Sequence, residues 1–290
     1  MTDASRQDEA IGFIRRQTPL RPAIALILGS GLGDFADELS EPVTIPASSI
    51  PHYPASTVEG HIGQLVFGRI AEGTSRSLPI LVFRGRVHYY ESESLRSILF
   101  PIELARLLGA RYLLSTNAAG GINRNFSPGD LMLIRDFIDL SFLRYQNRNT
   151  SAKTDADLPV HDQLADRFYF SRNVFDSRMQ DIIRQCATQN GIKLQEGTYC
   201  WLRGPTYETP AEIEMLGRIG SDAVGMSTVP EINEAYRLGM KIAGISLISN
   251  LAAGITKEPL SHGEVTETAS RVKADFTRLM RDVLFAIEDR

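Results

Sequence analysis

The amino-acid sequence predicts a chain of the α/β class. Apolar runs rich in β-branched residues alternate with segments of helical periodicity, and this alternation is typical of α/β folds. Of the 290 residues, 43% are hydrophobic and 23% are charged, which is enough apolar material for a large buried core. No repeat, low-complexity tract or linker divides the chain. We therefore expect one domain over residues 1–290, with its core at about 20–288.

Eight segments are predicted as strands because they are short, apolar and rich in β-branched residues. In chain order they are Ala23–Leu28, Gln64–Ile70, Pro79–Arg84, Tyr112–Asn117, Leu131–Asp136, Lys193–Leu202, Ala223–Met226 and Lys241–Ser249. Two stretches without a clear pattern, Pro46–Gly63 and Arg144–Phe170, are expected to be irregular.

Helices are predicted from capping signals and from apolar periodicity. In a capping box a hydroxyl residue and a glutamate three positions later satisfy each other's backbone N–H groups, and three candidates are Thr209 to Glu212, Thr228 to Glu231 and Ser261 to Glu264. The last helix has an apolar stripe for packing, formed by Val265, Ala269, Val272, Phe276, Leu279, Val283 and Ala286. A helix over Ser94–Leu108 is expected to be kinked or divided by Pro101.

Charge and cysteine content restrict the partners and the compartment. The 31 Lys and Arg against 35 Asp and Glu give a net charge of −4, which argues against a nucleic-acid partner. The N-terminus lacks the pattern of a signal peptide, and the longest weakly polar run, Ile242–Ile255, is shorter than the roughly 18 residues of a membrane span. Cys186 and Cys200 show no metal-binding spacing and are expected to be reduced core thiols. We expect a cytoplasmic protein without a membrane partner.

The glycine-rich segment Gly29-Ser-Gly-Leu-Gly33 directly follows a predicted buried strand. Its backbone N–H groups and the Ser30 hydroxyl could bind an anion. The spacing G-x-G-x-G differs from the G-x-G-x-x-G of dinucleotide-binding folds, and no Lys-Ser or Lys-Thr pair follows as in a phosphate-binding P-loop. A tight structural turn explains the segment equally well.

A second segment, from Gly85 to Glu91, combines two cationic side chains with a carboxylate. Arg86 offers a planar donor fork suited to phosphate, His88 can donate one more hydrogen bond, and Glu91 could orient either of them. A solvated surface loop is the alternative. His61 lies in another glycine-flanked loop and favours an anion site, although on its own it is also explained as a turn residue.

A strand end rich in small residues provides a third candidate. Ala118, Ala119 and Gly120 could let the backbone lie against a planar ligand or expose N–H groups to an anion. A strand end packed closely beneath a helix is the alternative.

Further along, Tyr207 and Glu208 have no role as turn or cap residues, and together they suit stacking on a heterocycle and hydrogen bonding to its edge. An exposed acidic turn is the alternative there.

Four further residues are candidates with simpler explanations of their own. Met226 could fill the core, and Ser227 could be a turn hydroxyl. His262, in the first turn of the last helix, could be exposed. Asn250 ends an otherwise apolar strand, where its amide needs partners for both its donor and its acceptor.

Taken together, the segments resemble the nucleoside phosphorylase family, in particular its trimeric purine nucleoside phosphorylases that act on 6-oxopurine nucleosides. Six motifs occur in the family's order between about Ala23 and Glu267: G-S-G-L-G, G-R-x-H-x-Y-E, N-A-A-G-G, G-P-x-[FY]-E-T-x-A-E, V-G-M-S-T-V-P-E and S-N-L-A-A-G. The resemblance implies a mixed, strongly twisted central sheet flanked by helices, in a single domain.

The resemblance also implies a role for each matching residue. Phosphate would be bound by Ser30, His61, Arg86, His88, the backbone of Ala118, and Ser227. Ribose would be bound by Tyr90, Met226, His262 and an aromatic residue lent by a neighbouring subunit, which we assign to Phe168 with Phe170 as the alternative. The purine would be bound by Ala118, Ala119, Gly120, Tyr207, Glu208, Met226 and Asn250, with Asn250, Glu208 and His88 as the catalytic residues.

The implied activity is reversible phosphorolysis of inosine or guanosine, with phosphate as co-substrate and without a metal or organic cofactor. Asn250 would donate to purine N7 and Glu208 would accept N1–H, a pattern that fits 6-oxopurines better than adenine. A methylthioadenosine phosphorylase of the same fold is the enzymatic alternative, and Asn250 argues against it because a 6-aminopurine specialist would favour Asp there. A non-catalytic nucleoside-binding protein is the alternative from another class.

Overall fold

The computed structural model describes residues 3–58, 62–72, 76–142, 173–256 and 262–288. The strands in these ranges are β1 Ile24–Leu28, β2 Ser40–Pro46, β3 Gln64–Glu72, β4 Arg76–Arg84, β5 Tyr112–Gly121, β6 Leu131–Asp139, β7 Leu194–Trp201, β8 Ala223–Gly225 and β9 Lys241–Leu251. The helices are α1 Asp3–Gln17, α2 Tyr89–Ser92, α3 Leu95–Leu108, α5 Ser177–Gln189, α6 Pro210–Arg218, α7 Val229–Arg237 and α8 His262–Glu288, with 3-10 turns η1 Gly33–Glu38 and η2 Ala47–Ser49. None of these helices is long and apolar enough to span a membrane.

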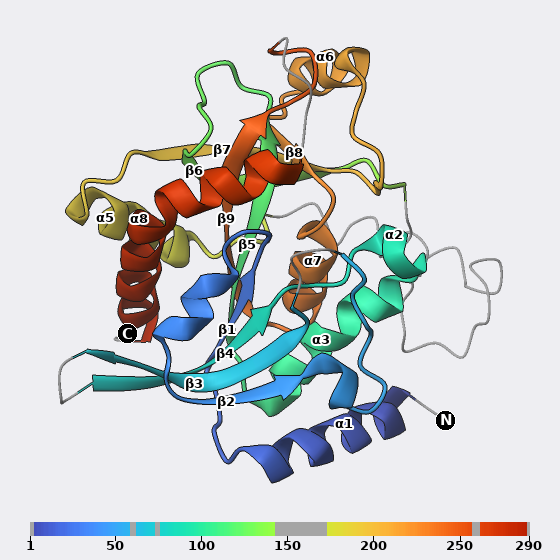
Figure 1. Ribbon diagram of the computed structural model, residues 1–290, viewed down its shortest axis with the longest axis vertical. Coiled ribbons are helices and arrows are strands. Elements are labelled where there is room, and N and C mark those ends of the chain that lie inside the picture. The colour runs from blue at the N-terminus through green and yellow to red at the C-terminus, as the bar shows by residue number, and fades with distance from the viewer. Residues whose placement is uncertain (1–2, 59–61, 73–75, 143–172, 257–261, 289–290) are drawn as a thin grey trace.

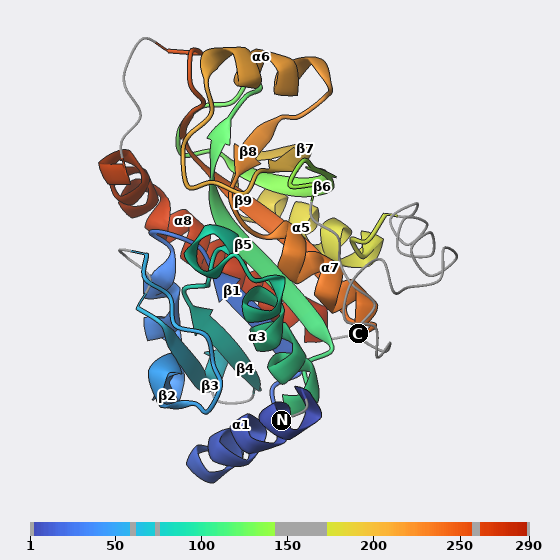
Figure 2. The same ribbon diagram turned by 90° about the vertical axis from the view of Figure 1, so that its right-hand side faces the viewer.

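The described strands form one mixed sheet with the order β2-β3-β4-β1-β5-β8-β7-β6-β9. Strand β9 also pairs with β5, so the strands from β5 to β9 close on themselves, while β1 to β4 extend from β5 as an open sheet. Pairing is parallel between β1 and β4 and antiparallel between β3 and β4. The sheet twists strongly between its two halves (Figure 1, Figure 2). The predicted α/β class with a mixed, twisted sheet is confirmed.

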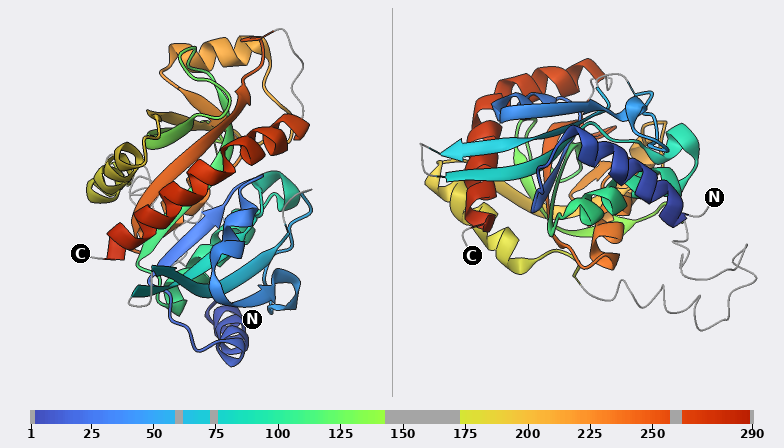
Figure 3. Two further views of the ribbon diagram at one scale, coloured as in Figure 1. Left: turned by 60° about the vertical axis from the view of Figure 1, so that its left-hand side comes forward. Right: turned by 90° about the horizontal axis from the view of Figure 1, so that it is seen from below.

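Helices cover both faces of this sheet because successive strand residues point to opposite sides. Leu113 belongs to the core shared with α1, α3 and α7, whereas its neighbour Leu114 belongs to the core shared with α5 and α8. The long helix α8 lies along β9 (Figure 3, left). Its predicted apolar stripe is confirmed as a packing face, since Ala269, Phe276 and Leu279 are all buried.

All eight predicted strands are present, whereas strand β2 and helices α1, α2 and α5 were not predicted. Strand β2 lies at the sheet edge with only Ile45 buried, so it lacks an apolar signal. Helix α1 buries only Ala10, Ile11 and Ile14 of its 15 residues. Of the two predicted effects of Pro101, a kink or a division, the division is wrong, because α3 runs through Pro101 as one helix.

The cap predictions have mixed outcomes. The box at Thr209 is confirmed, because Glu212 N donates to Thr209 Oγ1 at 3.3 Å and Thr209 N donates to Glu212 Oε2 at 2.7 Å. The box predicted at Thr228 is wrong, since its side chain makes no cap hydrogen bond there. Ser261 lies outside the described residues. Both cysteines are buried and unpaired, as predicted.

Candidate active site

A cavity of about 160 Å³ lies at the carboxyl ends of neighbouring parallel strands, where ligand sites of α/β sheets occur. Strands β4, β1, β5 and β9 run parallel in that spatial order. The predicted site residues whose side chains are described all line this cavity: Ser30, Arg86, His88, Tyr90, Ala118, Ala119, Gly120, Tyr207, Glu208, Met226, Ser227 and Asn250. His61, Phe168 and Phe170 lie outside the described residues, and so does the side chain of His262 at the start of α8.

The glycine-rich turn after β1 packs directly against the end of β5. Gly29 N donates to Thr116 Oγ1 at 3.2 Å, and Thr116 Oγ1 donates to Ile27 O at 2.9 Å. A Cβ atom on Gly29 would lie 2.5 Å from Asn117 Cα, so only glycine allows this approach. The close packing holds Ser30 at the wall of the cavity.

Replacing Gly29 with alanine is therefore expected to lower the free energy of unfolding by about 1–3 kcal/mol, because backbone must move to admit the methyl group. Gly33→Ala in the same turn is the matched control. A Cβ atom there would meet the side chain of Arg84 at an ordinary 3.6 Å. Urea denaturation of both variants tests the difference, and equal stability of the two would contradict the close contact at Gly29.

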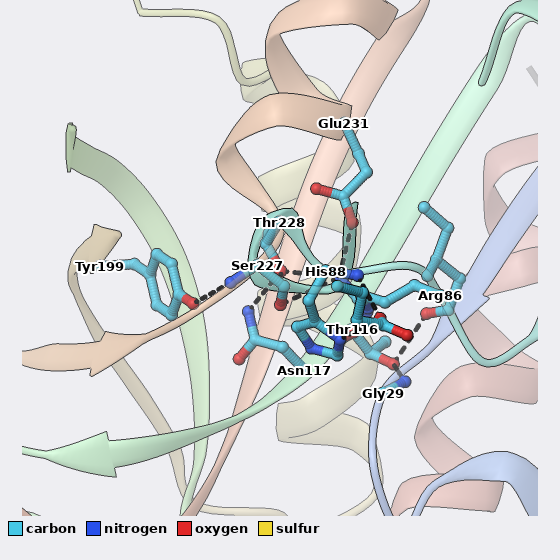
Figure 4. Close-up of polar contacts among 11 residues, drawn as sticks. Gly29, Arg86, His88, Thr116, Asn117, Tyr199, Ser227, Thr228 and Glu231 are labelled. Atoms are coloured by element: carbon cyan, nitrogen blue, oxygen red, sulfur yellow. Dashed lines mark hydrogen bonds and ion pairs between the residues drawn. The ribbon is translucent and has the colours of Figure 1, made fainter. Parts of the chain in front are cut away.

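Arg86 is the centre of a buried polar network. Only 8% of the residue is exposed. Its Nη1 donates to Ser227 Oγ at 3.3 Å, to Thr228 Oγ1 at 2.9 Å and to Glu231 Oε1 at 3.1 Å. Its Nη2 donates to the carbonyl of Thr116. Figure 4 shows these partners around the guanidinium: Thr116 on β5, Ser227 and Thr228 in the turn before α7, and Glu231 on α7.

The segment before α7 has an unusual backbone conformation. Thr228 has φ 79° and ψ −48°, and Val229 N donates across it to Ser227 O at 2.9 Å, which forms a γ-turn. A β-branched residue rarely adopts positive φ, and such strain is typical of functional sites. The turn directs Thr228 Oγ1 to Arg86 and to Asn117 Nδ2, which donates to it at 2.9 Å. These contacts replace the cap that the local sequence predicted.

His88 is held by a carboxylate. Glu91 Oε1 lies 3.3 Å from His88 Nδ1 and accepts from His88 N at 2.6 Å. Burial raises the pKa of Glu91, but hydrogen bonds from His88 and Thr57 outweigh it and lower that pKa to about 2. The predicted orienting role of Glu91 therefore holds for His88, while Arg86 pairs with a different residue. The ring of His88 stacks on Tyr90 with centroids 5.1 Å apart.

The opposite end of the cavity combines an amide and a carboxylate. Ser249 Oγ donates to Asn250 Oδ1 at 2.7 Å, and Asn250 Nδ2 donates to Leu251 O at 3.2 Å. Burial raises the pKa of the Glu208 carboxyl, and its Oε1 atom is buried without a hydrogen-bond partner in the described part of the chain. Tyr207 is 50% exposed. This end can therefore accept a hydrogen bond from a ligand, and it has an aromatic residue at its rim.

Sequence reasoning missed several members of the site. Thr116, Asn117, Thr228 and Glu231 all take part in the network around Arg86. Glu231 could be recognised once helix α7 is known to be buried, since all its residues from Val229 to Ala235 are buried. A charged residue in such a helix needs a buried partner. Within the described ranges, no three His, Cys, Asp or Glu side chains gather closely enough to hold a metal ion.

Known proteins similar to this chain share nearly its whole length. The model of the family described as "Phosphorylase superfamily" matches residues 23–284. Purine nucleoside phosphorylase 1 of Geobacillus stearothermophilus is 44% identical over 277 residues, covering 96% of each chain. The enzyme of the same name from Bacillus subtilis is 42% identical over 283 residues, covering 98% of this chain and 99% of the relative.

Solved structures that resemble this chain are purine nucleoside phosphorylases as well. Isoform 2 of purine nucleoside phosphorylase from Schistosoma mansoni, in complex with cytosine and ribose-1-phosphate, superimposes with a TM-score of 0.82 at 34% identity, covering 97% of this chain and 95% of that one. A purine nucleoside phosphorylase structure from Schistosoma in complex with hypoxanthine gives a TM-score of 0.80 at 31% identity, covering 97% and 96%.

Proposed function

Since the chain belongs to the phosphorylase superfamily and groups with its purine nucleoside phosphorylases, we propose that its cavity catalyses reversible phosphorolysis of inosine and guanosine. The products are the free base and ribose 1-phosphate, or deoxyribose 1-phosphate from deoxyribonucleosides, so the enzyme serves purine salvage. One observation carries the proposal: a single cavity joins an anion-binding end at Arg86 to an amide and carboxylate end at Asn250 and Glu208.

Phosphate is the nucleophile in this reaction. Arg86, His88, Ser30, Ser227 and the backbone of Ala118 bind it beside the ribose, with His61 as a further contact. A phosphate oxygen forms the bond to C1′ while the bond from C1′ to N9 breaks, and the electron pair goes to the purine. The proton that phosphate carried ends on the base. Since phosphate supplies the nucleophile, we propose that neither metal nor organic cofactor takes part.

The protein accelerates the reaction by stabilising the charge that develops on the purine. Asn250 Nδ2 donates to N7, and the Glu208 carboxylate accepts from N1–H and from the 2-amino group of guanine. Alanine and glycine at positions 118–120 leave flat space for the base, and Tyr90, Met226 and His262 bind the ribose. The amide and carboxylate pair fits 6-oxopurines, because a 6-amino group places a donor where a carbonyl is expected.

Hypoxanthine release from inosine by the purified protein tests the proposal. The rate is expected to depend strictly on added phosphate. Tight binding of inosine without turnover would support a non-catalytic nucleoside-binding protein instead. Faster turnover of methylthioadenosine than of inosine would support the other enzymatic alternative.

The Glu208 carboxylate that we assign to the base should also make the stability of the protein depend on pH. Because burial raises its pKa in the folded protein, ionised Glu208 costs stability at neutral pH. Glu208→Gln is expected to raise the free energy of unfolding at pH 7, and this gain should disappear as the pH falls through the raised pKa toward the ordinary value of 4.5. The same change should lower kcat/KM for inosine by at least about tenfold, because a charge-assisted hydrogen bond is lost.

Glu214→Gln is the matched control, since that carboxylate is exposed on α6 and pairs with Arg218. We expect its stability to follow pH as in the wild type and its activity to be unchanged. Lower stability of Glu208→Gln at pH 7, or undiminished activity, would contradict the assigned role of Glu208.

The proposal extends to assembly and location. We propose a homotrimer in which Phe168 of a neighbouring subunit completes each ribose site, by analogy with the family pattern. Two unpaired, buried cysteines suit a reducing compartment, and we propose the cytoplasm. Sedimentation of the purified protein tests the trimer, and Phe168→Ala compared with Phe170→Ala tests which aromatic residue serves the ribose.

A further inference from the structure

We propose that Glu231 is a positioning residue of the phosphate site, where it holds the Arg86 guanidinium in the orientation that binds phosphate. The inference rests on the proposed function and adds to it a residue that does not line the cavity itself. Glu231 reaches the site from α7 and acts through Arg86. Figure 4 shows its side chain extending from that helix toward the guanidinium.

The contact between the two side chains is direct and buried. Glu231 Oε1 lies 3.1 Å from Arg86 Nη1, and the two side chains are 3% and 5% exposed. Water therefore competes little for this ion pair. Of the contacts that Arg86 Nη1 makes to Ser227, Thr228 and Glu231, the one to Glu231 joins opposite charges and is therefore the strongest kind of the three.

Glu231 adds a charged acceptor to a set of neutral ones. Ser227 Oγ, Thr228 Oγ1 and the Thr116 carbonyl are neutral acceptors for the guanidinium, whereas the Glu231 carboxylate makes a charge-assisted contact from a buried helix. Arg86 and Glu231 also line a second, mainly apolar cavity of about 30 Å³ together with Tyr53, Phe83 and Pro101.

A role in positioning differs from a role in charge balance, and the two predict opposite results. Phosphate is an anion, so the charge of Glu231 by itself repels it. If Glu231 mattered only through its charge, neutralising it would strengthen phosphate binding. If it positions Arg86, losing the contact weakens phosphate binding even when the charge is kept.

Two variants separate contact from charge. Glu231→Asp keeps the charge but withdraws the carboxylate by one methylene group, so we expect the KM for phosphate to rise at least about tenfold. Glu231→Gln keeps an acceptor of the same length and loses the charge, so we expect a rise of about threefold or less. The KM for inosine should stay within about twofold in both variants.

Glu234 provides the matched control on the same helix. It is 3% exposed, like Glu231, but its carboxylate pairs with Arg237 at 2.6 Å. Glu234→Asp and Glu234→Gln should change thermal stability without changing the KM for phosphate. A phosphate-dependent shift in melting temperature of each variant gives a second measurement that requires no turnover.

The outcomes are distinct. An unchanged KM for phosphate in Glu231→Asp, or a lowered KM in Glu231→Gln, overturns the inference. Parallel changes in the KM values for phosphate and inosine also overturn it, because they indicate a general structural role. If Glu231→Asp does not fold, Glu231→Gln decides alone: a rise in the KM for phosphate of about two- to threefold supports positioning, and an unchanged or lowered KM overturns it. A wild-type protein without phosphorolysis would refute the proposed function instead, since the variants are compared only with an active wild type.

Discussion

Replacing Arg86 with methionine is expected to lower kcat/KM for inosine phosphorolysis by at least about a hundredfold, since two or more charge-assisted hydrogen bonds of about 1.5–3 kcal/mol each are lost. The same change should lower the free energy of unfolding by about 3–5 kcal/mol, because it leaves a buried carboxylate without its partner. That carboxylate is Glu231, of which 2% is exposed. Steady-state kinetics and urea denaturation measure the two effects.

Arg84→Met provides the matched control, two residues earlier on β4. Arg84 pairs with Asp37 at 2.9 Å, but the carboxylate is exposed, so the ion pair contributes about 1 kcal/mol or less. We also expect Glu231→Leu, added to Arg86→Met, to recover stability without recovering activity. A single Arg86→Met variant as stable as Arg84→Met would contradict the buried ion pair.

Replacing Asn250 with aspartate is expected to shift the preference for the base. Asn250 Nδ2 is the group that we assign to purine N7, and a carboxylate there accepts hydrogen bonds from a 6-amino group or a protonated N7. The ratio of kcat/KM for inosine to that for adenosine should fall at least about tenfold, because buried hydrogen-bond mismatches are strongly penalised. Initial rates with both nucleosides measure the ratio.

The KM for phosphate is the internal control in this experiment, because Asn250 lies on β9 away from the Arg86 network. It should stay within about twofold of the wild-type value. An unchanged nucleoside ratio would contradict the role of Asn250 in base recognition. A large change in the KM for phosphate would instead indicate that the variant disturbs the whole cavity.

Much of the fold could be predicted because its core strands have a strong local signal. Strand β1 is wholly buried and wholly apolar, and β9 is buried over eight of its eleven residues, most of which are apolar or glycine. Strand β2 could not be predicted, because an exposed edge strand owes its structure to its neighbour β3 more than to its own residues. Helix α1 gave a weak signal for a similar reason, since its packing is limited to one narrow face.

The site was predictable where its residues form sequence motifs at strand ends. Ser30, Arg86, Ala118 and Asn250 follow or end β1, β4, β5 and β9, and the parallel pairing brings those ends together. Glu231 was misread because the pattern of a hydroxyl residue followed by a glutamate three positions later also describes a helix cap. Its true partner, Arg86, is 145 positions away in the sequence, and only the folded chain brings them together.

Product analysis by ³¹P NMR tests the central claim most directly. The purified protein is incubated with inosine and phosphate, and ribose 1-phosphate is quantified against hypoxanthine. We predict that the two products appear in equal amounts and that neither forms without phosphate. Hypoxanthine accompanied by free ribose would show that water is the nucleophile, and this would contradict the account of Arg86 and the phosphate end of the cavity.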